Sequence, residues 1–140
     1  MRTFENTKIA VVGLGYVGLP LAIEFGKIFE TVGYDIDRER IRQLSEGVDL
    51  TLEIAACELA EAKNLQYSCA IQEIKSCNIY IVTVPTPIDK ANKPDLLPLI
   101  EASKAIGAQL NKDDIVIYES TVYPGATEEI CVPILEEFSG

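Results

Sequence analysis

The chain has 140 residues and a formal net charge of −10, with 48% hydrophobic and 24% charged residues. This composition is typical of one globular domain, and the acidic charge argues against a nucleic-acid partner or an anionic membrane surface. The sequence contains no histidine, which excludes a histidine base and a histidine-bound metal for this chain.

The four cysteines, Cys57, Cys69, Cys77 and Cys131, form neither a C-x-x-C motif nor a metal-ligand spacing. The start of the chain is polar, and no apolar run approaches the roughly 20 residues of a membrane span. We therefore expect a cytoplasmic protein without a membrane partner or a metal. Its reduced cysteines are expected to fill core or surface positions.

The first part of the chain reads as strand, glycine turn, helix and strand. Residues 9–12 form a continuous apolar run, which predicts a strand covered on both faces. A G-x-G-x-x-G sequence follows at residues 13–18. A second strand is predicted over residues 31–34 and leads directly to Asp35.

The helix between these strands is predicted from helical spacing. Leu21, Phe25 and Ile28 recur on what should be one buried face. We expect the helix to begin near Tyr16. Pro20 then lies close to the first turn, where few amides need partners.

Each glycine of the turn has a distinct predicted task. Gly13 permits the tight turn, Gly15 lets a pyrophosphate approach the backbone, and Gly18 lets the helix pack against the sheet. The helix start offers amides and a positive dipole end to a diphosphate. Asp35 can accept hydrogen bonds from ribose hydroxyls and would repel a 2′-phosphate, which indicates NAD rather than NADP. The alternative is a structural glycine turn with Asp35 as a solvated cap.

Arg40 allows two interpretations. It lies about one turn into the next predicted helix, near the end of the strand that carries Asp35. It could therefore lie over the adenine or its ribose. It could equally be a solvated arginine that pairs with Asp37 or Glu39.

The rest of the sequence continues the alternation of helices and strands. The predicted strands lie at 65–68, 78–84 and 114–119. The predicted helices lie at 37–47 with Ile41 and Leu44 on the inner face, at 52–63, and at 70–75 as a short helix. A longer helix should run from an N-cap at Asp95 to about residue 111 with Pro98 in its first turn, and a last helix should begin near residue 126 with a kink or break at Pro133.

This alternation predicts an α/β fold: a Rossmann-like, doubly wound parallel sheet of five strands in the order 3-2-1-4-5. No sequence is left for a sixth strand, so the fifth strand should be an unprotected edge. In such sheets a ligand lies across the carboxyl ends of the strands. The turns at residues 13–18, 84–87 and 119–125 should meet there.

Two threonines in these turns are candidate ligands of a cofactor. Prolines on both sides of Thr86 stiffen the backbone that presents it, and Thr121 follows the fifth predicted strand. Either hydroxyl could contact a nicotinamide or position a water. As turn residues, both could instead satisfy local backbone groups, and spacing alone does not decide.

Taken together, the motifs resemble the N-terminal, NAD-binding domain of the UDP-glucose/GDP-mannose dehydrogenase family. The matching stretches are VGLGYVGLP at 12–20, GYDID at 33–37 with Arg40, VPTP at 84–87 and STVYPG at 120–125. They are spread over nearly the whole chain in the family's order. The stretches 47–53 and 118–121 are most similar to members that oxidise UDP-N-acetylhexosamines for surface polysaccharides.

This resemblance implies an NAD-dependent, two-step oxidation of a sugar C6 alcohol to a carboxylate. The residues that match the family's cofactor-binding positions are Gly13, Leu14, Gly15, Tyr16, Val17 and Gly18 around the pyrophosphate, Asp35 and Arg40 at the adenosine ribose, and Val84, Thr86 and Thr121 towards the nicotinamide. In the family, the threonine matching Thr121 also helps to position a water near the reacting carbon, which implies a catalytic role. Glu119 falls at a variable place and receives no role.

The chain also departs from the family. A thioester between two hydride transfers needs a thiol nucleophile, which the family carries in a glycine-rich motif well downstream. None of the four cysteines lies in such a motif, and the helical middle and sugar-binding parts are absent. We therefore expect residues 1–140 to be the cofactor domain of a longer, homo-oligomeric enzyme that acts on a UDP-sugar, and to be inactive alone.

Two other functions are open at this point. A β-hydroxyacid-type dehydrogenase shares the glycine turn, but such an enzyme is expected to have a different turn after the fifth strand and a catalytic lysine on a later helix. A stand-alone NAD(H)-sensing module would need no active site at all. The full reading frame distinguishes a longer enzyme from such a module.

Overall fold

The computed structural model describes residues 6–15, 17–47, 56–84, 97–119 and 131–139. They build one parallel sheet with the strand order β3-β2-β1-β4-β5. The strands are β1 (Lys8–Val12), β2 (Glu30–Tyr34), β3 (Leu65–Ser68), β4 (Ile79–Val82) and β5 (Ile115–Tyr118). The helices are α1 (Gly18–Gly26), α2 (Arg38–Ser45), α3 (Ala56–Glu61), the short 3₁₀ helix η2 (Ile71–Ile74), α4 (Leu97–Gly107) and α5 (Val132–Ser139).

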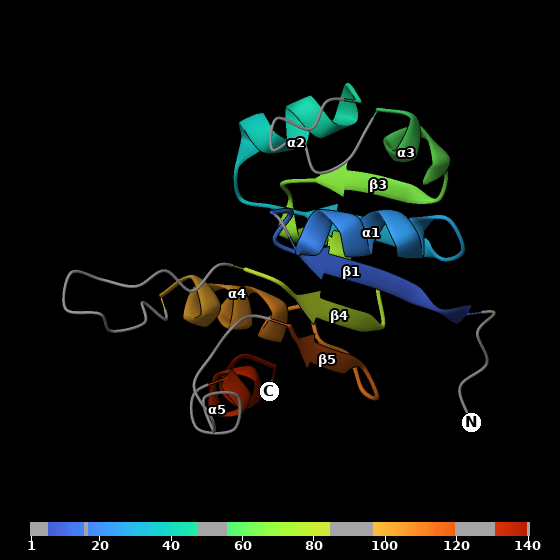
Figure 1. Cartoon of the computed structure of the whole chain (residues 1–140). Helices are drawn as coiled ribbons and strands as arrows, with labels where there is room; N and C mark the ends of the chain where they lie inside the picture. Colours follow the sequence, from blue (N-terminus) through green and yellow to red (C-terminus); the bar gives the residue numbers. More distant parts are fainter. Residues whose placement is uncertain (1–5, 16, 48–55, 85–96, 120–130, 140) are drawn as a thin grey trace.

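The predicted Rossmann-like topology is confirmed. The strands run in the same direction, so their carboxyl ends lie along one edge of the sheet (Figure 1). The register aligns Val12 of β1 with Tyr34 of β2 and with Val82 of β4. The three central strands therefore end level, which brings the chain after β1 and the chain after β4 side by side.

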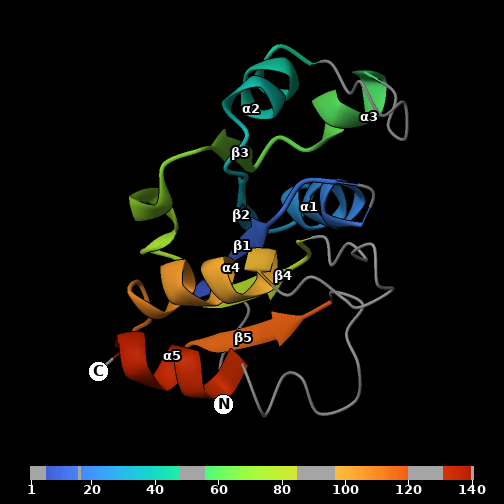
Figure 2. The same cartoon turned by 90° about the vertical axis from the view of Figure 1, so that its left-hand side faces the viewer.

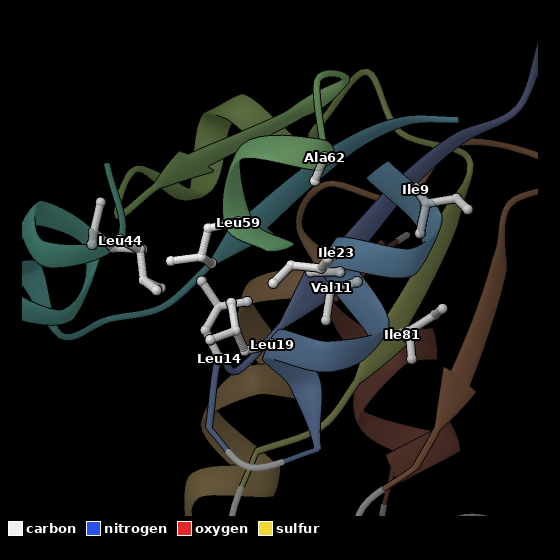
Figure 3. Packing of buried hydrophobic residues seen from close by; sticks show 11 residues of the cluster. Ile9, Val11, Leu14, Leu19, Ile23, Leu44, Leu59, Ala62 and Ile81 are labelled. Carbon is white, nitrogen blue, oxygen red and sulfur yellow. The ribbon is translucent and has the colours of Figure 1, made fainter. Parts of the chain in front are cut away.

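The sheet has a hydrophobic core on each face, and β1 contributes to both. Ile9 and Val11 belong to the cluster shared with α1, α2 and α3, whereas Ala10 and Val12 belong to the cluster shared with α4. This alternation is the period of two expected of a strand, and it explains why the predicted strand is apolar throughout. Figure 3 shows side chains of β1, α1, α2 and α3 gathered in the first cluster.

Helices also lie at both ends of the sheet, beyond its central strands. α2 packs beside β3 at one end of the sheet, where α3 also lies, and α5 packs on α4 at the end that carries β5 (Figure 2). Within the described residues β5 pairs with β4 alone, so it is an edge strand as predicted. No helix in the described ranges has the length and apolarity needed to cross a bilayer.

The prediction for the first helix is wrong at its C-terminal end. Ile28, which helical spacing placed on the buried face, lies beyond α1 and is 74% exposed. The most buried side chains of the helix include Leu19 and Ile23, whereas Leu21 and Phe25 are only partly buried. The helical period does not extend to residue 28 because the chain already turns there towards β2.

Pro98 lies in the first turn of α4, as predicted. Pro133 is the second residue of α5, which directly follows a π-helical residue, Cys131. The chain before Cys131 lies outside the described residues, so the kink or break expected at Pro133 stays a prediction. The predicted start near residue 126, the N-cap at Asp95 and the first residues of the predicted helix 52–63 lie outside the described residues.

The two isoleucines near the end of α1 give a test of this core. Ile23 is 1% exposed and packs in the first cluster, so Ile23→Ala should lower the free energy of unfolding by about 2–5 kcal/mol. Ile28→Ala removes the same atoms from an exposed position and should cost less than about 0.5 kcal/mol. Urea denaturation measures both values. Equal losses for the two variants would contradict the packing described here.

Candidate cofactor site

The site begins where β1 ends. Gly13 has a φ of +99°, a backbone conformation that side chains disfavour. Its amide donates a 2.8 Å hydrogen bond to the carbonyl of Tyr34. A Cβ at this position would lie 2.9 Å from the amide nitrogen of Val84. The tight turn predicted at Gly13 is confirmed, and it is wedged between the ends of β2 and β4.

Gly18 begins α1 and lies directly against this turn. A Cβ added there would overlap the carbonyl oxygen of Gly13 and the hydroxyl of Thr83. No rotation of a side chain could relieve the first overlap, because it is with main chain. The prediction that Gly18 permits close packing of the helix is therefore confirmed. The partner is the turn itself together with the end of β4.

Gly15 differs from both. A Cβ added at Gly15 would meet no heavy atom within 4 Å, and the residue is exposed. The turn is open at this position, at the start of α1. The N-cap residue Val17 is 52% exposed and gives α1 no side-chain cap. An uncapped helix start with exposed main chain is a suitable place for an anion. Tyr16 lies outside the described residues.

Leu14 is fixed by the packing of its side chain and by hydrogen bonds to both of its main-chain polar groups. Its side chain is completely buried in the first cluster. Its amide donates to Oδ2 of Asp35 at 2.9 Å, and its carbonyl accepts from Nε of Arg40, also at 2.9 Å. The contribution of Leu14 is therefore to fix the turn, with its side chain in the core.

Asp35 lies at the end of β2 and is half-buried. Its Oδ2 accepts the amide of Leu14 and its Oδ1 accepts the amide of Asp37, each at 2.9 Å. A carboxylate oxygen has two acceptor positions, so each oxygen keeps one for a ribose hydroxyl. The carboxylate is thus more than a solvated cap, because it joins β2 to the glycine turn.

Arg40 points to the turn and not to its acidic neighbours on α2. Its Nε donates a hydrogen bond to the carbonyl of Leu14, whereas Glu39 forms its salt bridge with Arg42. Asp37 acts as N-cap of α2 and accepts the main-chain amide of Arg40 at 3.2 Å. The structure therefore places the guanidinium beside the glycine turn, and its contact with the adenine or its ribose stays a prediction.

Burial keeps two titratable groups of the domain neutral, Tyr34 beside the site and Cys77 at the opposite edge of the sheet. Burial raises the pKa of the Tyr34 phenol, and the nearby Asp35 and Cys69 raise it further. Burial also raises the pKa of the Cys77 thiol to about 11, so this cysteine is protonated and unreactive. Cys69, Cys77 and Cys131 are free thiols. In the described part of the chain, no group of three acidic, cysteine or histidine side chains could hold a metal ion.

The far side of the site is described only in part. Val84 follows β4, and its partly buried side chain packs on the second cluster. Glu119 is exposed at the end of β5, and its amide donates to the carbonyl of Val82 at 2.8 Å. Thr86 and Thr121, predicted near the nicotinamide, lie outside the described residues.

Sequence reasoning missed Thr83. Its side chain is buried, and its hydroxyl lies 2.6 Å from the carbonyl oxygen of Gly13. The available signal was a threonine at the end of a buried strand that should lie beside the glycine turn. The VPTP motif that carries the resemblance begins one residue later, at Val84, and does not include Thr83.

A parallel sheet with this strand order, an open glycine turn at a helix start and a carboxylate at the end of β2 define a dinucleotide-binding domain. The acceptor positions of Asp35 and the open space at Gly15 fit the ribose and diphosphate of such a ligand.

The chain belongs to the UDP-glucose/GDP-mannose dehydrogenase family, because the sequence model of that family's NAD binding domain matches residues 7–140. NAD is accordingly the cofactor of this domain. The membership sets aside the β-hydroxyacid-type dehydrogenase.

Individual relatives agree with this assignment. The chain is 61% identical over 136 residues to the UDP-N-acetyl-D-glucosamine 6-dehydrogenase of Pseudomonas aeruginosa, covering 97% of this chain and 32% of that protein. It is 57% identical over 140 residues to the enzyme of the same name from Salmonella typhi, covering 100% of this chain and 33% of that one. The solved UDP-D-ManNAc dehydrogenase of Pyrococcus horikoshii matches with a TM-score of 0.84 and 33% identity, over 96% of this chain and 33% of that one. The chain thus spans about a third of the length of the curated relatives it matches.

Two glycine substitutions separate binding from folding. Gly15→Ala places a methyl group in open space, so the free energy of unfolding should change by less than about 1 kcal/mol. The same methyl group would stand where the diphosphate is expected to approach, so the Kd for NAD should rise about tenfold or more. Gly18→Ala should instead destabilise the fold by about 1–3 kcal/mol or more, because its methyl group overlaps main chain.

Calorimetric titration with NAD and urea denaturation measure these two effects. Unchanged NAD affinity in Gly15→Ala would show that the open turn is not the diphosphate site. A fully stable Gly18→Ala would show that the close approach of α1 is not required.

Proposed function

We propose that this chain is the cofactor domain of an NAD-dependent UDP-N-acetylhexosamine 6-dehydrogenase. The longer enzyme would oxidise the C6 alcohol of the sugar to a carboxylate in two steps. The observation that carries the proposal is the 61% identity to a UDP-N-acetyl-D-glucosamine 6-dehydrogenase, over a stretch that includes the open glycine turn and Asp35. NAD, when bound, supplies the hydride acceptor.

The proposed division of tasks follows the carboxyl edge of the sheet. The turn at 13–18, including Tyr16 and Val17, holds the diphosphate. Asp35 and Arg40 hold the adenosine ribose. Val84, Thr86 and Thr121 line the nicotinamide end, and Thr121 also positions a water. The open main chain at Gly15 and the remaining acceptor positions of Asp35 support the first two assignments.

We also propose that residues 1–140 act as one cofactor domain, and that the catalytic thiol and the sugar-binding residues belong to other parts of a longer protein. The share of its relatives that the chain spans, about a third, supports this. The buried and protonated Cys77 is unsuited to be the nucleophile. A homo-oligomeric state and a cytoplasmic location of the longer protein remain predictions.

The chain should bind NAD in preference to NADP. At 100 times its Kd, NAD should stabilise the chain by about 2.7 kcal/mol, whereas the 2′-phosphate of NADP would meet the charge of Asp35. Asp35→Ala should weaken NAD binding about tenfold or more and bring the two affinities together. Thermal shift and titration calorimetry measure these effects.

Asp37→Ala is the matched control for this experiment. It removes a neighbouring carboxylate that caps α2, so it should cost about 1 kcal/mol of stability but keep the preference for NAD. Equal thermal shifts with NAD and NADP in the unaltered chain would remove the argument based on Asp35.

The substrate proposal is tested on the full-length protein. With NAD present, we expect a UDP-N-acetylhexosamine to be oxidised in preference to UDP-glucose and to yield twice as much NADH as sugar consumed. Absorbance of NADH and chromatography of the sugar product give both quantities. Preference for UDP-glucose would overturn the sugar class, and a single NADH per sugar would overturn the two-step reaction.

A further inference from the structure

We infer that Thr83 is a positioning residue for the NAD diphosphate: its buried hydroxyl sets the orientation of the glycine turn that receives it. The inference rests on the proposed function, because it takes the turn at residues 13–18 as the diphosphate site. Thr83 itself would not contact the cofactor, because its hydroxyl is directed to the carbonyl of Gly13 and acts on the turn through that residue.

The hydroxyl has a well-defined acceptor. Thr83 directly follows β4 and is 8% exposed. Its Oγ1 lies 2.6 Å from the carbonyl oxygen of Gly13 and 3.0 Å from that of Val12. The Val12 oxygen already accepts the main-chain amide of Thr83 at 2.8 Å. A hydroxyl has one proton to donate. We assign it to the shorter contact, so the Thr83 hydroxyl donates its hydrogen bond to the carbonyl of Gly13.

This hydrogen bond and that of Asp35 act on a single peptide unit. The carbonyl of Gly13 and the amide of Leu14 belong to the same planar peptide bond. Thr83 holds its oxygen, and Oδ2 of Asp35 holds its N–H at 2.9 Å. With both ends fixed, the plane of this peptide cannot rotate. The direction in which the chain enters Gly15 is then determined.

The neighbouring contacts make the position of the hydroxyl critical. A Cβ on Gly18 would overlap both the Gly13 oxygen and the Thr83 hydroxyl, so the start of α1 rests on these two groups. If the hydroxyl were lost, the buried Gly13 oxygen would lack this donor. A buried acceptor without a partner is costly, and rotation of the peptide would relieve the cost by moving the turn.

The test compares variants that keep or lose the hydroxyl. Thr83→Val preserves shape and removes the donor, Thr83→Ala removes it with less bulk, and Thr83→Ser retains it. Thr31→Val is the matched control, because Thr31 is 1% exposed and its hydroxyl donates to the carbonyl of Phe29 at 2.9 Å, before the start of β2 and away from the glycine turn. Titration calorimetry gives the Kd for NAD and for ADP-ribose, and thermal melts give Tm.

We expect Thr83→Val and Thr83→Ala to raise the Kd about tenfold, and by the same factor for NAD and ADP-ribose, since both ligands carry the diphosphate. Thr83→Ser should stay within about threefold of the unaltered chain. Thr31→Val should lower Tm without changing either Kd. A merely structural role of Thr83 would lower Tm and leave both Kd values unchanged, as in the control.

The outcomes separate this inference from the proposed function. If the unaltered chain binds NAD and neither Thr83→Val nor Thr83→Ala weakens binding, the inference is overturned and the proposed function stands. A loss confined to NAD would place the defect at the nicotinamide end and also overturn the inference. If Thr83→Val does not fold, the Thr83→Ala and Thr83→Ser pair decides by the same criterion. Failure of the unaltered chain to bind NAD would overturn both.

Discussion

The structure depends on the close contact of three pieces of main chain at the carboxyl edge of the sheet: the turn after β1, the end of β4 and the start of α1. The contact is possible only because Gly13 and Gly18 carry no side chains. Once the three pieces meet, their buried polar groups have to find partners within the protein. Thr83 at the end of β4 provides one of them, and Tyr34 at the end of the adjacent strand β2 provides another.

This constraint explains why the residues expected to bind ribose also hold the turn. Asp35 accepts the Leu14 amide, and Arg40 donates to the Leu14 carbonyl. The proposed ribose and diphosphate subsites are therefore joined through the main chain of one buried leucine. A ligand that fills one subsite meets the other already in place, which reduces the entropy that binding has to offset.

Much of this was predictable from sequence. The strand order follows from the alternation of strands and helices, and Leu65–Ser68 matches β3 residue for residue. Two features were not predictable, because long-range contacts decide them. Ile28 fits a helical period but lies beyond the helix end, and Thr83 resembles any other residue of its predicted strand until its acceptor on Gly13 is seen. Pairings between residues about 70 positions apart leave no local pattern in the sequence.

The glycine motif therefore combines two requirements that its letters do not distinguish. Gly13 and Gly18 satisfy the fold, and a protein that bound nothing would still need them for this packing. Gly15 has open space around it, so packing alone gives no reason for a glycine there. What separates a binding turn from a structural one is thus the single glycine without a packing reason, next to a carboxylate whose oxygens each keep an acceptor position. In this chain both features are found at the same end of the sheet, and the match to an NAD binding domain agrees with them.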